Sequence, residues 1–196
     1  MVLGQDFGTQ DYYNKVHKED GEVKMSTTWR NLIPLLVALD ISPEACFFTN
    51  TFMGLREDGK MTGPCNPALN PNSPFSEACK NFLMAQIEAI LPELVLVLGT
   101  YPARTLAAWW PEDFSDWTAL KGVTRPLAEN RFYDGLTKPF YDVRFGDKDV
   151  RFVFALHPSM SNTHRGLIWG KNGDGGAHEI AHLKAFMPMS LSGSGS

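Results

Sequence analysis

Three polar side chains of kinds that take part in catalysis each follow a short apolar stretch of this sequence. Asp6 follows "VLGQ", Asn50 follows "CFFT" and His157 follows "FAL". Open α/β sheets bind their ligands in the crevice outside the carboxyl ends of parallel strands. If the three stretches are neighbouring parallel strands, a carboxylate, an amide and an imidazole therefore meet in one crevice.

The spacing of apolar residues predicts the strands that would carry these side chains. The run "ELVLVLG", which ends at Gly99, is typical of a strand buried in a parallel sheet. Residues alternate in character on both sides of a Gly-Asp turn at Gly146, which predicts a hairpin whose second strand, Val150 to Leu156, enters the sheet. Together with the stretches before Asp6 and Asn50, this gives a sheet of four strands.

Helices are predicted between these strands, in four segments with apolar residues at helical spacing or with a capping residue at the start. The first begins at Ser26 or Thr27, and the second begins at Ser73 or Ser76. The third covers "YPARTLAAWW", and the fourth occupies Ala177 to Phe186. Residues 9–25 lack a clear period and are predicted to form a surface loop, and residues 111–140 are predicted to be irregular. Strands that alternate with helices predict an α/β fold, here a three-layer α/β/α sandwich with a central, mainly parallel four-stranded sheet.

Length and composition are those of an ordinary globular chain. The 196 residues suit one domain, assigned to residues 1–189, and residues 190–196 resemble a flexible linker or an expression scar. No stretch approaches the roughly 20 apolar residues that span a bilayer. The formal charge of −4 argues against non-specific coating of nucleic acid.

The number of cysteines indicates whether the protein occupies an oxidising or a reducing compartment. There are three, an odd number, and no secretory signal precedes the first predicted strand, which favours a reducing environment over a disulfide framework. We therefore expect a soluble cytoplasmic protein, associated with the nucleoid if its source is prokaryotic.

The polar stretches at the strand ends resemble the motifs of the uracil-DNA glycosylase superfamily. "GQDFG" is similar to its water-activating motif, "TN" within "FFTNTFMGLR" is similar to its base-reading asparagine motif, and "HPSMSN" is similar to its His-Pro-Ser motif. The segment "NPNSPFSEACKNFLMAQIEAILPELVLVLG" also resembles the part that joins the last two motifs. The likeness covers most of residues 1–187 and keeps the motifs in the order of the family.

This resemblance implies that Asp6 and His157 are the catalytic residues. Breaking the bond between a pyrimidine and its sugar leaves a cationic sugar and an anionic base, so groups that stabilise both charges raise the rate. Asp6 would position the attacking water and face the cationic sugar. Neutral His157 would donate a hydrogen bond to the base oxygen on which negative charge collects.

The same resemblance assigns further residues to the base and to the DNA. Asn50 would read the imide edge of the base, and the backbone N–H of Gln5 would line its pocket. An aromatic ring would stack on the base, and the candidates are Phe7, Tyr12, Tyr13 and Phe48. The loop that would grip the backbone of a flipped nucleotide comprises Pro158, Ser159, Met160, Ser161 and Asn162, and the candidates for phosphate contacts are Arg56, Arg165 and Lys171.

Three departures from the family pattern bear on the substrate and the cofactors. Gly8 stands where one branch has a tyrosine that excludes the methyl group of thymine. Lys24 or Met25 stands where an aromatic residue is expected before the first long helix. One branch holds an iron–sulfur cluster with four cysteines, but of these positions only that of Cys79 is matched here. We therefore predict no cluster and no other cofactor.

A zinc-peptidase pattern is a competing motif. In "HEIAH", His178 and His182 lie one helical turn apart, and Glu179 between them would act as the base. Such sites need a third protein ligand, and no His, Asp, Glu or Cys follows this motif, although His164 and Asp174 lie upstream. The other interpretation is an amphipathic helix whose polar residues face outward and whose inward residues are Ile180, Leu183 and Phe186.

The sequence thus predicts a monomeric, monofunctional DNA glycosylase, a hydrolase of DNA repair that excises uracil or a related modified pyrimidine without a metal. DNA is the expected partner, and no membrane is involved. One alternative is a catalytically silent relative of the same fold that binds nucleic acid or a protein partner. The other alternative is the zinc peptidase.

Overall fold

The computed structural model describes residues 1–18, 26–57, 59–60, 63, 70–114, 140–160, 165 and 175–187. Within them, the fold is built on one sheet. Its strands are β1 (Val2–Gly4), β2 (Phe48–Asn50), β3 (Leu94–Leu98), β4 (Tyr141–Phe145) and β5 (Lys148–Ala155), in the order β2-β1-β3-β5-β4. The first four in this order run parallel, as predicted. The sheet has five strands rather than four, because β4 pairs with β5 antiparallel and both arms of the hairpin join it.

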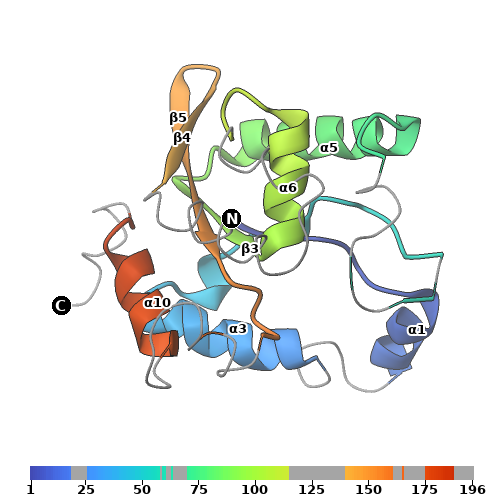
Figure 1. Ribbon diagram of the computed structural model, residues 1–196, viewed down its shortest axis with the longest axis horizontal. Coiled ribbons are helices and arrows are strands. Elements are labelled where there is room, and N and C mark those ends of the chain that lie inside the picture. The colour runs from blue at the N-terminus through green and yellow to red at the C-terminus, as the bar shows by residue number, and fades with distance from the viewer. Residues whose placement is uncertain are drawn as a thin grey trace.

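Helices cover both faces of the sheet, which confirms the predicted α/β/α sandwich (Figure 1). One face carries α5 (Pro74–Ile90) and α6 (Thr100–Trp109), and the other carries α3 (Thr27–Ala38) and α10 (Gly175–Lys184). A 3₁₀ turn, η1 (Pro43–Ala45), precedes β2. None of the described helices has the length and apolar character that crossing a membrane demands.

Two of the helix starts follow the predicted capping residues. The Ser26 hydroxyl accepts a hydrogen bond from the Thr28 N–H at 3.2 Å at the start of α3, and the Ser73 hydroxyl accepts one from the Ser76 N–H at 3.1 Å at the start of α5. Each cap satisfies a donor that has no partner inside its helix. Local chemistry is therefore enough to set these two boundaries.

The prediction of a surface loop over residues 9–25 was wrong for its first part. Helix α1 (Gln10–Lys18) lies there, at the end of the molecule far from α10 (Figure 1). The Thr9 hydroxyl accepts a hydrogen bond from the Tyr12 N–H at 3.2 Å, and Asp11 places a negative charge in the first turn. These are helix-start signals. They were missed because the segment is mostly exposed and has no clear apolar period.

The core lies in two layers, one on each face of the sheet. Alternate residues of β3 point to opposite faces: Val95 and Val97 pack towards α5 and α6, whereas Leu94, Leu96 and Leu98 pack towards α3 and α10. Every residue of β3 is buried, which explains why its sequence is a continuous apolar run. The central strand therefore holds both layers to one sheet.

Truncation of Phe152 tests this packing. Its ring on β5 is fully buried and lies 5.1 Å from the ring of Phe114, centroid to centroid. We expect Phe152→Ala to lower the free energy of unfolding by about 3–5 kcal/mol, because the substitution opens a cavity. In Val37→Ala, which truncates a side chain with 60% exposure, the change should stay within about 0.5 kcal/mol. Urea denaturation measures both, and equal effects would contradict the assigned core.

Candidate active site

The carboxyl ends of four parallel strands bring the predicted residues to one edge of the sheet. Gly4 at the end of β1 is paired with Asn50 at the end of β2, and Leu98 on β3 is paired with Ala155 on β5. Asp6 and His157 each follow their strand by two residues. The charge of Asp6 acts on the pKa of His157, so the two side chains share one electrostatic environment.

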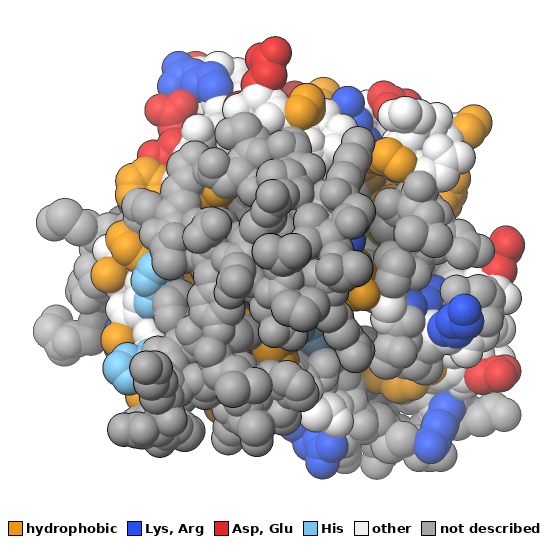
Figure 2. Space-filling model, viewed as in Figure 1, with side chains coloured by type: hydrophobic (Ala, Val, Ile, Leu, Met, Phe, Trp, Pro, Cys, Tyr) orange, Lys and Arg blue, Asp and Glu red, His pale blue; other side chains and the backbone are white. Residues whose placement is uncertain are grey.

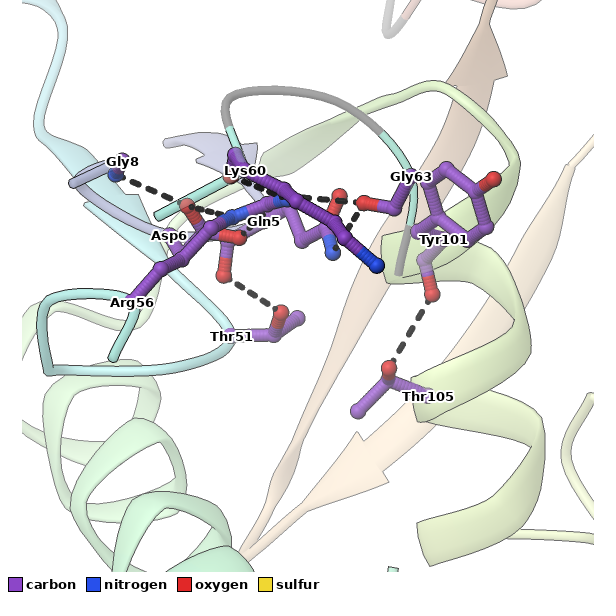
Figure 3. A network of polar contacts seen from close by, with 9 residues as sticks. All are labelled: Gln5, Asp6, Gly8, Thr51, Arg56, Lys60, Gly63, Tyr101 and Thr105. Atoms are coloured by element: carbon purple, nitrogen blue, oxygen red, sulfur yellow. Dashed lines mark hydrogen bonds and ion pairs between the residues drawn. The ribbon is translucent and has the colours of Figure 1, made fainter. Parts of the chain in front are cut away.

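Asp6 is held in a nearly buried ion pair with Arg56 (Figure 3). Arg56 Nε donates to Asp6 Oδ1 at 3.0 Å and Nη2 donates to Oδ2 at 2.8 Å, a two-pronged contact in which each side chain has 5% exposure. The Gly8 N–H also donates to Oδ1, at 2.8 Å. The carboxylate therefore has a fixed orientation and a neighbouring positive charge.

The structure places Arg56 in the site rather than on the surface, which differs from the predicted phosphate contact. Its backbone N–H donates to Gly8 O at 2.7 Å, and its guanidinium also donates to the carbonyl oxygens of Lys60 and Gly63 at 3.1 and 2.9 Å. These contacts fold the segment after β2 back against the Asp6 bend. A guanidinium bound in this way is not presented to the phosphates of a DNA backbone.

Gln5 and Asn50 complete the wall formed by β1 and β2. The Gln5 carbonyl accepts hydrogen bonds from the Thr51 hydroxyl and the Phe52 N–H, both at 2.9 Å, and its amide donates to Gly63 O at 3.3 Å. Asn50 is half-buried, and a Cβ added to Gly4 would lie 2.4 Å from its Oδ1. Gly4 thus leaves the room that the Asn50 amide occupies.

Hydrogen bonds at the His157 ring select one neutral tautomer. The Ser159 N–H donates to His157 Nδ1 at 3.3 Å, and a backbone N–H can only donate. Nδ1 is therefore the acceptor, and the Ser159 hydroxyl, 2.7 Å from the same nitrogen, is its second donor. In the neutral ring the proton consequently lies on Nε2, so that Nε2–H is the group available to a ligand.

The surroundings of His157 also keep its ring neutral. Burial lowers the pKa of His157 below its ordinary value, the positive charge of Arg165 lowers it further, and the negative charge of Asp6 acts in the opposite direction. Gly99, with φ of +88°, permits the close approach of the ring, because a Cβ there would lie 3.0 Å from His157 Cβ. The site therefore combines a carboxylate with a neutral donor.

The turn after His157 is anchored to the protein at several points. The Met160 N–H donates to His157 O at 2.9 Å, and the Asn31 side chain of α3 donates to Pro158 O at 2.8 Å. Pro158 is buried and Ser159 is exposed, while Met160 is half-buried and packs against the core. Ser161, Asn162 and Lys171 lie outside the described residues, as do Lys24 and Met25.

Two predicted ligand-binding side chains take part in internal contacts instead. Phe48 is half-buried and packs against the core on the α3 face, with its ring 4.8 Å from that of Trp29, centroid to centroid. Arg165 is buried and pairs with Glu179 rather than facing outward to a phosphate. Phe7, in contrast, has 40% exposure and directly follows Asp6.

The structure argues against the zinc-peptidase interpretation of "HEIAH". Glu179 is buried, accepts a hydrogen bond from the Leu156 N–H at 2.7 Å and pairs with Arg165, so its carboxylate is not available as a base. No three His, Cys, Asp or Glu side chains among the described residues are grouped so that they could hold a metal. Histidine side chains lie at the surface over α10 (Figure 2), and His178 is exposed.

The amphipathic interpretation of this helix is correct except at Glu179. Leu183 is fully buried, and Ile180 and Phe186 are half-buried, as predicted. Glu179 faces inward with them, although polar residues were expected outside. One signal was present in the sequence, because Glu179 lies four residues before Leu183 and therefore on the same face of the helix.

The fold and the site define an α/β/α protein with a carboxylate, an amide and a neutral imidazole at the carboxyl edge of its sheet. The sequence profile of the Uracil DNA glycosylase superfamily matches residues 16–178, and the chain belongs to this superfamily. The matched range includes Asn50 and His157 and begins after Asp6. Members of the superfamily are in general DNA glycosylases, hydrolases that act on DNA in repair. No curated protein shows a significant match to the chain.

The lowered pKa of His157 predicts a pH dependence of stability. Below the ordinary histidine pKa of about 6.5, the unfolded chain takes up a proton that the folded site resists. The stabilisation is present above that value and is lost as the pH falls towards the lower pKa of the folded state. Between pH 7 and 5, wild type should therefore lose more unfolding free energy than His157→Gln does. Superimposable pH curves from urea denaturation of the two proteins would contradict this.

Because the Asp6–Arg56 pair is nearly buried, breaking it should lower the unfolding free energy far more than breaking the more exposed Arg151–Asp142 pair. Removing one partner of a buried pair leaves the other charge uncompensated, at a cost of about 3–5 kcal/mol. We expect Arg56→Met to lower the unfolding free energy by that amount. The matched control is Arg151→Met, which removes the partner of the more exposed Asp142 and should cost about 1 kcal/mol or less from lost pairing. Equal losses in denaturation experiments would show that the Asp6 pair is not buried in solution.

Proposed function

We propose that this protein is a monofunctional DNA glycosylase, which hydrolyses the N-glycosidic bond of a flipped-out uracil or related modified pyrimidine without a metal. The observation that carries the proposal is the hydrogen bond from the Ser159 N–H to His157 Nδ1, from which we infer that the neutral ring carries its proton on Nε2. A neutral donor at this position, beside a carboxylate, suits a reaction in which the base departs as an anion. Membership of the superfamily supports the same assignment.

The two charges that develop in the reaction have separate stabilising groups in this site. As the glycosidic bond breaks, its electron pair leaves with the base, and His157 Nε2–H donates to the base oxygen that gathers this charge. Asp6 faces the sugar, which becomes cationic, and orients the water that adds to it. Asp6 Oδ2 accepts a hydrogen bond from Arg56 at 2.8 Å, and we assign its remaining lone pair to the water.

Recognition of the base is assigned to the wall formed by β1 and β2. Asn50 offers both a donor and an acceptor to an imide edge. The Gln5 backbone lines the pocket, and the exposed ring of Phe7 is the candidate for stacking. Gly8 has no side chain with which to reject a 5-substituent, so we propose that pyrimidines with such groups are also accepted.

DNA is the proposed partner, and extrusion of the nucleotide must precede the chemistry. We assign the gripping of the backbone to the turn of Pro158, Ser159 and Met160, with Ser161 and Asn162 after it. Ser159 is exposed, and Met160 is anchored by its backbone to His157 O. A turn fixed in this way can hold a phosphate in register with the His157 ring.

One observation favours a second candidate, a catalytically silent relative that binds nucleic acid. The guanidinium of Arg56 neutralises Asp6 through a two-pronged contact. A carboxylate whose charge is offset stabilises a cationic sugar less well. The two candidates differ in base release, because both predict DNA binding and only the glycosylase predicts cleavage.

Base release from oligonucleotides tests the proposal. Single- and double-stranded substrates would carry uracil, thymine mispairs, hypoxanthine or 5-substituted pyrimidines. We expect wild type to release uracil, and Asp6→Asn and His157→Ala each to lower the single-turnover rate by about 10²- to 10³-fold, because each removes a group that stabilises transition-state charge. Asp142→Asn, which alters the surface pair on β4, is the control and should retain the wild-type rate.

The outcomes separate the candidates. Release of a 5-substituted pyrimidine but not of uracil would correct the substrate and keep the reaction. DNA binding without release of any base would support the silent relative. Release that persists at the wild-type rate in both Asp6→Asn and His157→Ala would exclude the assigned catalytic residues.

A further inference from the structure

We propose that Arg165 and Glu179 form a buried latch that fixes the position and the tautomer of His157, which makes both of them positioning residues for base release. The effect on rate rests on the proposed glycosylase function, whereas the effect on the ring does not. The latch is defined as the Arg165–Glu179 ion pair together with its hydrogen bonds to the backbone around His157.

Glu179 attaches α10 to the end of β5. Its carboxylate has 1% side-chain exposure, and Oε1 accepts a hydrogen bond from the Leu156 N–H at 2.7 Å. Leu156 lies one residue beyond the end of β5 and is fully buried. A buried N–H without an acceptor is costly. Glu179 therefore satisfies a donor on the residue directly before His157.

Arg165 connects the same carboxylate to the turn that follows the strand. Its Nη1 donates to Glu179 Oε2, its Nη2 donates to His157 O at 2.9 Å, and its Nε donates to Met160 O at 3.3 Å. The guanidinium is planar and its donors have fixed directions. The three acceptors are consequently held in one geometry, with the backbone of His157 among them.

The latch and the ring tautomer are linked through the turn. Met160 O and His157 O are at the two ends of the turn in which the Ser159 N–H donates to His157 Nδ1. If Arg165 no longer holds both ends, that N–H is no longer aligned with the ring, and the preference for a proton on Nε2 weakens. The charge of Arg165 also lowers the pKa of His157, next in importance to burial.

Loss of the latch should displace the His157 ring but leave the backbone turn after it folded. Asn31 of α3 holds Pro158 O independently, at 2.8 Å, and Pro158 is buried. A displacement of about 1 Å in a catalytic group can cost about 10²-fold in rate. The expected defect is therefore in the chemical step and not in the binding of DNA.

The test compares Glu179→Gln, Arg165→Met and Arg165→Lys with Arg151→Met, which breaks an Arg–carboxylate pair between β5 and β4. Each protein is measured for single-turnover release of uracil, for DNA affinity over a range of salt concentrations, and for the ¹⁵N signals of the His157 ring, which distinguish the tautomers. A double variant, Arg165→Met with Glu179→Gln, removes both charges and keeps an amide oxygen as the acceptor for the Leu156 N–H. Because it leaves neither an uncompensated buried charge nor an unsatisfied N–H at Leu156, this variant separates positioning from folding.

We expect Glu179→Gln, Arg165→Met and the double variant to lower the rate by about 10- to 100-fold, with DNA affinity within about threefold of wild type. The His157 ring should change from the Nε2–H form to a mixture of tautomers, and in Arg165→Met its pKa should rise. Arg165→Lys, which keeps the positive charge but lacks the planar guanidinium with its several donors, should recover part of the rate. Arg151→Met should match wild type in every measurement.

Two results would overturn the latch. In the first, Arg165→Met weakens binding to all DNA sequences and lowers the salt slope by about one, while Glu179→Gln does not, as expected for a phosphate contact. In the second, the folded double variant keeps the wild-type ring tautomer. If wild type releases no base, the proposed function fails, and the ring signals alone still decide whether the latch positions His157.

Discussion

Parallel pairing of β1 with its neighbours is the constraint on which the rest of this structure depends. Parallel strands all end at the same edge of a sheet, and the connections between them must pass over its faces. The pairing of β1 with β2 and β3, and of β3 with β5, therefore gathers residues from distant parts of the chain at one edge. The same connections supply the helices that bury both faces of the sheet.

Two buried ion pairs follow from that convergence, and they have different consequences. Arg56 pairs with Asp6 itself, and Arg165 pairs with Glu179 behind the His157 turn. The first pair orients the carboxylate of Asp6 but offsets its charge. The second pair holds the backbone around His157, and the charge of Arg165 lowers the pKa of the His157 ring. The site is thus organised by two arginines that bind protein atoms, in a chain whose formal charge is −4.

The charges and hydrogen bonds around His157, at this edge of the sheet, affect both the pH dependence of stability and the protonation of its ring. Burial and Arg165 lower the pKa of His157, while Asp6 opposes them, and the net effect favours the neutral form of the ring. A neutral imidazole needs a partner on Nδ1 to present a proton on Nε2, and Ser159 supplies it. The catalytic role proposed for His157 therefore depends on a turn and not on the histidine alone.

The sequence by itself determined the parallel strands, two candidates for each of two helix caps and the α/β/α class, because apolar period and capping are local properties that neighbouring residues specify. It did not determine that α1 forms, that Phe48 packs against the core on the α3 face or that Arg56 binds Asp6. The last contact joins residues 50 positions apart, and that between Glu179 and Leu156 joins residues 23 apart. Only the tertiary structure decides such pairings, because local patterns do not encode which buried charge meets which partner.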